Sequence, residues 1–208
     1  MITSNIGLPR EKALPFYREA ARLLRFAKAP DLFRIQVFGL YASTLSILNK
    51  CDEALEVLNI FIDLTKKYAG KIKQSANRDQ WLEVADLLVG AQISKIGIGM
   101  RLQREDIKKE AIAELHVTLQ TALTDSRATG GVAHPKLIEL KMWQIVCNCL
   151  MGSTQDSEGP LRQLETKLLN LPNNKERREV HQKIQLALID ARANDWSNFF
   201  DRFSPSPN

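Results

Sequence analysis

The sequence predicts an all-α protein of about eight helices, arranged as antiparallel helical hairpins. Apolar residues recur three or four positions apart along most of the chain, which is the period of one helix face. No segment of useful length has the alternating period of a strand. In two places an apolar helix, a short polar turn and a second helix with an acidic start follow one another. Stacked hairpins of this kind are binding surfaces more often than catalytic sites.

The first part of the chain predicts helices over 9–27, 32–49 and 52–69. Pro9 suits the start of a helix, and Pro30 interrupts the helical pattern between the first two ranges. The second range is apolar on most faces, which indicates a helix packed between neighbours. Only about three residues, 49–51, separate it from the third range, so these two helices should be antiparallel.

The middle of the chain predicts helices over 79–102 and 105–128. Gly90, Gly97 and Gly99 weaken the first of these helices and should allow a bend or the close approach of another helix. Gly130 and Gly131 end the second helix.

The last part predicts helices over 134–151, 160–170 and 175–193, and a short helical piece over 196–203. Pro135 suits a helix start, and Pro172 closes the second of these helices. The expected organisation is a single domain over 1–203 followed by a disordered tail over 204–208.

Composition and charge narrow the class of protein. The chain is 44% hydrophobic and 25% charged, which is ordinary for a globular domain. The net charge of +5 is a mild basic bias and not a nucleic-acid signature, because 24 acidic residues accompany 29 basic ones. Three cysteines suggest no disulfide framework, and neither a secretory signal nor a membrane-spanning run is expected. These features predict an intracellular protein, cytoplasmic or nuclear.

Several packing positions resemble the tetratricopeptide family of helical repeats. An aromatic residue on the first helix of a repeat and a small residue early on the second are matched by Tyr41 and Ala54. Ala111 matches the small residue of a second copy, and residues 169–172 resemble the proline-closed end of a repeat. The two alanines are 57 residues apart, against a family period of about 34. The resemblance therefore implies a divergent tetratricopeptide-like α-α superhelix.

We expect no enzymatic activity, metal or cofactor. Cys147 and Cys149 are one residue apart, so a helix directs their thiols about 200° apart, whereas zinc ligands are usually spaced by two to four residues. No serine, cysteine and histidine pattern resembles a nucleophilic triad. Gly97 and Gly99 lack the preceding strand and the following lysine of a phosphate-binding loop.

The leading functional hypothesis is a non-catalytic adaptor or scaffold that binds a partner peptide or helix in a groove of the helical stack. Its oligomeric state is open. The side chains expected to face that groove are Arg34, Tyr41, Gln92 and Lys95. A second cluster near the end of the chain fits either the core or an interface with a partner. It consists of Trp196, Phe199, Phe200 and Phe203.

The alternative hypothesis is a nucleic-acid-associated helical protein that uses two basic segments, 66–78 and 175–183. The first segment contains a basic patch of Lys66, Lys67, Lys71, Lys73 and Arg78. In the second segment, Glu176 and Glu179 dilute the positive charge. Neither segment interleaves aromatic residues that could stack on bases.

Overall fold

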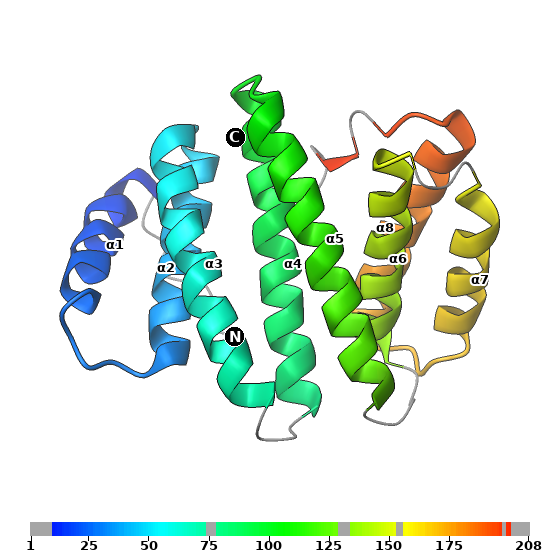
Figure 1. Cartoon of the computed structure of the whole chain (residues 1–208), viewed down its shortest axis with the longest axis horizontal. Coiled ribbons are helices and arrows are strands. Elements are labelled where there is room, and N and C mark those ends of the chain that lie inside the picture. The colour runs from blue at the N-terminus through cyan, green and yellow to red at the C-terminus, as the bar shows by residue number, and fades with distance from the viewer. Residues whose placement is uncertain (1–9, 74–77, 129–133, 153–155, 197–198, 201–208) are drawn as a thin grey trace. The chain divides into compact units, whose positions relative to one another are not determined.

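The computed structural model describes residues 10–73, 78–128, 134–152, 156–196 and 199–200 of the chain, and these residues form eight α-helices and no strand (Figure 1). The all-α prediction and the number of helices are confirmed. The helices are α1 (Arg10–Leu24), α2 (Asp31–Ile47), α3 (Cys51–Lys73), α4 (Arg78–Arg101), α5 (Glu105–Ala128), α6 (Pro135–Leu150), α7 (Glu158–Leu169) and α8 (Lys175–Ala193). The largest differences from the predicted bounds are at α1, which ends three residues early, and at α3, which continues four residues further.

Two compact units divide the chain, one of residues up to Tyr68 and one that begins at Ala69. The division falls inside α3, where the sequence shows no change of composition. The single domain over 1–203 stays a prediction, and the tail over 204–208 lies outside the described residues.

The first unit contains α1, α2 and the first part of α3. The helix α1 packs on α2 and buries one stripe of its surface, made by Leu14, Ala21 and Leu24. On the other side of α2, Gly39 lies against α3, because a Cβ atom at Gly39 would be 3.0 Å from Cε2 of Phe61. The absence of a side chain at this position therefore lets the Phe61 ring pack onto the α2 backbone.

The turns between α2 and α3 and between α4 and α5 have the same backbone geometry. Asn49 and Gln103 are in the left-handed region, with φ angles of 56° and 54°. After each of them, one amide donates to the carbonyl five residues back: Lys50 N to Leu45 O at 2.9 Å and Arg104 N to Gly99 O at 2.8 Å. This is the Schellman closure of a helix end. It reverses the chain within three residues in both predicted hairpins.

The two turns are 54 residues apart, from Asn49 to Gln103, whereas Ala54 and Ala111 are 57 apart. The two alanines are therefore not equivalent positions relative to their turns. Both are nevertheless fully buried, as expected for small residues at helix crossings.

The second unit packs α4 to α8 around one hydrophobic core. In this unit α5 packs on α4 and α6, and α8 packs on α6 and α7 (Figure 1). Trp143 of α6 is in the core, where its ring is 5.5 Å from that of Phe199 and 6.1 Å from that of Phe200, measured between centroids. The segment after α8 thus covers α6 with aromatic side chains.

We predict that Gln103→Gly raises the free energy of unfolding by about 1 kcal/mol, because a non-glycine residue is strained in the left-handed region. Asn49→Gly should gain only a few tenths of a kcal/mol, roughly, since asparagine tolerates this conformation. The control Gln163→Gly, at an exposed position inside α7, should lose about 1 kcal/mol. Thermal unfolding followed by circular dichroism measures all three, and a loss of stability in Gln103→Gly would contradict the prediction.

A second pair of variants tests how closely α4 approaches α5. A Cβ atom at Gly99 would be 3.1 Å from the backbone nitrogen of Lys108, whereas at Gly90 it would meet nothing within 4 Å. Gly99→Ala should therefore destabilise the protein by about 1–3 kcal/mol. Gly90→Ala should stabilise it by about 0.5–1 kcal/mol, because alanine loses less backbone entropy on folding. Shifts of the same sign in the unfolding midpoint would refute this description of the α4–α5 approach.

Candidate functional site

Large apolar side chains gather at the surface of α1 and the beginning of α2. We call this set the α1 apolar surface; it consists of Phe16, Leu23, Phe26, Leu32 and Phe33. Phe16 and Phe26 are 69% and 84% exposed, although they are among the largest apolar side chains in the chain. Phe16 and Leu23 lie two helical turns apart, on one side of α1, while the stripe with Leu14 faces inward. Single exposed apolar residues are ordinary, whereas five large ones within one short segment are unusual.

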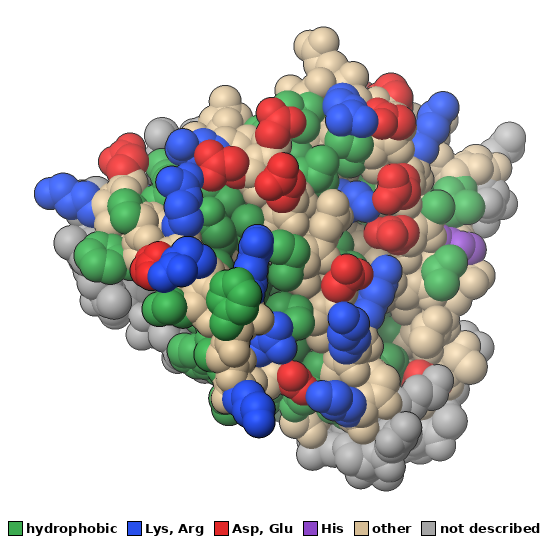
Figure 2. Space-filling model, turned by 60° about the vertical axis from the view of Figure 1, so that its left-hand side comes forward, with side chains coloured by type: hydrophobic (Ala, Val, Ile, Leu, Met, Phe, Trp, Pro, Cys, Tyr) green, Lys and Arg blue, Asp and Glu red, His purple; other side chains and the backbone are tan. Residues whose placement is uncertain are grey.

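The same segment carries a net positive charge. Residues 10–34 contain seven Lys and Arg against three Asp and Glu, a net charge of +4 out of +5 for the whole chain. Figure 2 shows hydrophobic side chains at the surface between Lys and Arg side chains on the side of the molecule where α1 comes forward. The segment that contains the α1 apolar surface is therefore basic.

A cleft of about 250 Å³ lies between α1 and α3 and above α2. Its floor is apolar and buried, with side chains from all three helices. The α1 wall consists of Arg18, Arg22 and Arg25, and the α3 wall carries Glu53 and Glu56. The floor consists of Ala21, Phe38, Tyr41 and Val57.

One end of this cleft is bridged by an ion pair. Nη2 of Arg18 donates to Oε2 of Glu53 at 2.7 Å, and its Nε donates to the Tyr41 hydroxyl at 3.4 Å. The hydrogen bonds to Tyr41 and Glu53 raise the pKa of Arg18. The hydrogen bond from Arg18, assisted by Lys50 at 3.6 Å, lowers the pKa of Glu53. Because Arg18 and Glu53 are about half exposed, this pair contributes little stability and mainly positions the two walls.

The other end of the cleft has no bridge. Arg22 pairs with Glu19 on its own helix at 2.7 Å. Arg25 and Glu56 have no side-chain partner within the described part of the chain. The cleft therefore offers one unpaired guanidinium and one unpaired carboxylate on opposite walls above an apolar floor.

The four predicted partner-binding residues are in different environments. Tyr41 lies in the floor of the cleft, and Arg34 is half-buried on α2. Gln92 and Lys95 are 0% and 5% exposed, so the prediction that they face a groove is wrong. The helix α4 is buried on most of its faces, and Gln92 and Lys95 make their polar contacts with α5 instead of with solvent.

These α4 side chains form a line of polar contacts with α5. Nε2 of Gln92 donates to Thr118 at 2.9 Å. Nζ of Lys95 donates to Glu110 at 2.8 Å and lies 3.6 Å from Glu114. The positions 110, 114 and 118 recur every four residues on α5 and therefore share one face. The buried Lys95 ammonium is thus held by two carboxylates of the same chain.

The aromatic cluster near the end of the chain belongs to the core. Trp196, Phe199 and Phe200 are buried, and the alternative of an exposed interface is wrong for these three residues. Edge-to-face contacts join Phe199 to both Trp196 and Phe200. Phe203 lies outside the described residues.

The two basic segments, 66–78 and 175–183, differ in how far their charges are exposed or paired within the chain. Lys66 and Lys67 are exposed in the first unit and Lys71 is exposed in the second, whereas the side chains of Lys73 and Arg78 lie outside the described part. In the segment 175–183, most of the charge is used within the chain. Lys175 pairs with Glu179, Arg177 donates to the Leu171 carbonyl at 2.6 Å, and Lys183 pairs with Glu139.

The cysteines do not form a site. The Cys147 thiol is buried and donates to the Ile112 carbonyl at 3.5 Å, and burial raises its pKa to about 12. Cys149 is only half-buried. Among the described residues, no group of three His, Cys, Asp or Glu side chains is placed to hold a metal ion.

A polar cluster that the sequence did not reveal lies where α4, α6 and α8 meet. Glu139 is buried and accepts from Nε1 of Trp143 at 3.3 Å and from Lys183. Lys136 lies 3.7 Å from Asp86, whose pKa is raised first by burial and then by the nearby Glu139. Two carboxylates are thus balanced by two ammonium groups, which is the arrangement of a structural ion cluster.

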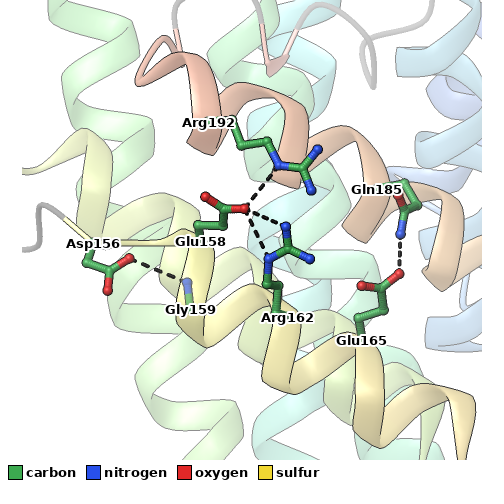
Figure 3. Close-up of polar contacts among 7 residues, drawn as sticks. All are labelled: Asp156, Glu158, Gly159, Arg162, Glu165, Gln185 and Arg192. Carbon is green, nitrogen blue, oxygen red and sulfur yellow. Dashed lines mark hydrogen bonds and ion pairs between the residues drawn. The ribbon is translucent and has the colours of Figure 1, made fainter.

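Ion pairs and hydrogen bonds also join α7 to α8 (Figure 3). Glu158 accepts from Arg162 at 2.8 Å on its own helix and from Arg192 of α8 at 3.0 Å. Two turns further along, Glu165 accepts from Gln185. The hydrogen bonds from Arg192 and Arg162 lower the pKa of Glu158. These groups hold each other, and none of them is directed at a cleft.

Comparisons with protein-family models, curated proteins and solved structures find no match. Within the described residues, every helix is too short or too polar to cross a lipid bilayer.

The lowered pKa of Glu158 gives a pH prediction. Its folded-state pKa lies below its ordinary value of 4.5, so its contribution to stability is complete above pH 4.5 and is lost as the pH falls through the folded-state pKa. We expect Glu158→Gln to lower the unfolding midpoint at pH 7, and the difference from the parent protein to vanish in acid. Arg192→Gln should behave in the same way. The control Glu83→Gln, at an exposed position without a described ion pair, should show no such pH dependence.

Proposed function

We propose that this chain is a non-catalytic protein-interaction module, an adaptor or scaffold that binds a helix or peptide of a partner protein through the α1 apolar surface. The observation that carries the proposal is the gathering of exposed Phe16, Leu23 and Phe26 with Leu32 and Phe33. The exposed large apolar side chains of the second unit are scattered along its helices. They are Leu87, Val117, Met151, Leu169 and Ile189.

Apolar burial can supply the binding energy at such a surface. Covering one exposed phenylalanine is worth about 1.5–3 kcal/mol, and aromatic side chains are common anchors at the centre of interfaces. On the exposed side of α1, the apolar residues Phe16 and Leu23 are seven positions apart, which is two helical turns. A partner helix with apolar residues at the same spacing could lie along this side. The proposed surface therefore differs in place from the groove expected from α2 and α4, although the class of function is the same.

The side chains around the cleft support a binding role instead of catalysis. They are guanidinium and carboxylate groups, and the Tyr41 hydroxyl is already hydrogen-bonded to Arg18. The described lining contains no pairing of a nucleophile with a base. The three cysteines carry free thiols, which suits the reducing interior of the cell, cytoplasmic or nuclear. The tetratricopeptide-like packing positions fit the same class of interaction protein.

A double variant tests the α1 apolar surface. We expect Phe16→Ser with Phe26→Ser to lose partner proteins that the parent chain retains, because two apolar anchors are removed. The matched control is Val117→Ser with Ile189→Ser, which removes two exposed apolar side chains of the second unit. Affinity capture with quantitative mass spectrometry compares the three proteins after nuclease treatment. Unfolding midpoints should agree, since substitutions at exposed sites change stability by about 0.5 kcal/mol or less.

Proteins retained by the Phe16 and Phe26 double variant but lost from the Val117 and Ile189 control would place the binding surface elsewhere and refute the proposal. Recovery that depends wholly on nucleic acid, and disappears on nuclease treatment, would favour the nucleic-acid alternative instead.

A further inference from the structure

We infer that the cleft between α1 and α3 selects acidic partners: it receives an apolar side chain of a bound peptide together with a neighbouring carboxylate, which pairs with Arg25. This inference rests on the proposed function and specifies the chemistry of the partner.

The positive wall of the cleft is made by arginines of α1 and of the turn after it. Arg18 and Arg22 are four residues apart on one face of α1, and Arg25 follows in the turn directly after the helix. Arg18 is held across the cleft by Glu53, but Arg25 has no side-chain partner in the described part of the chain. A guanidinium group binds a carboxylate with two parallel hydrogen bonds, which are stronger than those between neutral groups. The unbridged end of the cleft is therefore suited to an anion.

The floor specifies what must accompany that anion. Phe38 and Tyr41 are nearly inaccessible to solvent, and with Ala21 and Val57 they give the cleft an apolar base. Its volume of about 250 Å³ is smaller than the roughly 300–1,000 Å³ of typical small-molecule sites. The space fits one or two side chains of a peptide and not a cofactor. An aliphatic or aromatic side chain on the floor would bring its acidic neighbour to the α1 wall.

The opposite wall favours a peptide over a membrane or a nucleic acid. Glu53 is compensated by Arg18 and Lys50, but Glu56 has no described partner. A continuous row of phosphates would meet this carboxylate as well as the arginines. A peptide can place one carboxylate near Arg25 and present uncharged or positive groups to Glu56. The cleft is also concave, whereas a bilayer surface requires a flat or protruding apolar face.

Two synthetic peptides test the inference on the full-length chain. Each is a fluorescein-labelled amphipathic helix of about 16 residues with leucine at positions i, i+3, i+4 and i+7. One peptide carries glutamate at its polar positions, and the other carries lysine. Fluorescence anisotropy measures the dissociation constants. We expect the glutamate peptide to bind and the lysine peptide to bind at least about tenfold more weakly.

Variants in the cleft separate specific recognition from general charge attraction. Arg25→Gln should weaken binding of the glutamate peptide about tenfold, through loss of a charge-assisted contact. Glu56→Gln should strengthen it, because a like charge is removed. The matched control is Lys28→Gln, which removes the same charge at an exposed position outside the cleft and should change affinity by less than about twofold.

Equal affinity for the two peptides, equal effects of Arg25→Gln and Lys28→Gln, or failure of the glutamate peptide to bind would each overturn the inference. So would Arg25-dependent binding to vesicles of phosphatidylserine and phosphatidylcholine without binding of the glutamate peptide. If the captured partners depend on Phe16 and Phe26 but are unchanged by Arg25→Gln, the proposed function stands and the acidic selectivity fails. If no captured protein depends on Phe16 and Phe26, the proposed function itself fails.

Discussion

The closure of a helix end within three residues is the constraint on which each hairpin depends. At Asn49 and at Gln103 one residue takes the left-handed conformation, and the next amide returns to a carbonyl of the preceding turn. Because the connection is so short, the two helices must be antiparallel and in contact. At the second turn, Gly99 lies against the first turn of α5, so the two backbones approach closely. The buried contacts of Gln92 and Lys95 with α5 follow from this pairing.

The helices could be predicted from the sequence because their signals are local. The bounds of α5 agree at both ends, where an acidic start and a glycine pair mark its limits. The environment of Lys95 could not be predicted in this way. A polar side chain on an apolar helix has the same sequence pattern whether it faces water or a carboxylate on the next helix. The residues after α8 have the same ambiguity, since aromatic side chains suit a core and an interface equally.

The candidate surface was not found from the sequence for a related reason. Helical periodicity predicts a stripe of Leu14, Tyr17, Ala21, Leu24 and Ala27. In the structure Leu14, Ala21 and Leu24 are buried, Tyr17 is half-buried and Ala27 is exposed. The remaining apolar residues of the segment, Phe16 and Phe26, were left unassigned. The sequence did contain one signal for this surface. The 15-residue helix α1 has apolar residues on two opposite sides, and packing on α2 buries only one of those sides. The cleft could not be predicted either, because it is formed by the packing of α1, α2 and α3. Periodicity along the chain does not show how three helices pack together.

The buried thiol of Cys147 is a chemical probe of how often the core of the second unit opens. A thiol with a pKa of about 12, bonded to a carbonyl of α5, is protonated and inaccessible while α5 and α6 stay packed. An alkylating reagent reaches it only when that packing opens, so its labelling rate counts the openings of the core. Cys149, two residues further along α6, is half-buried and can react without such an opening. The two cysteines thus distinguish transient exposure of the surface from unfolding of the core in a single labelling experiment.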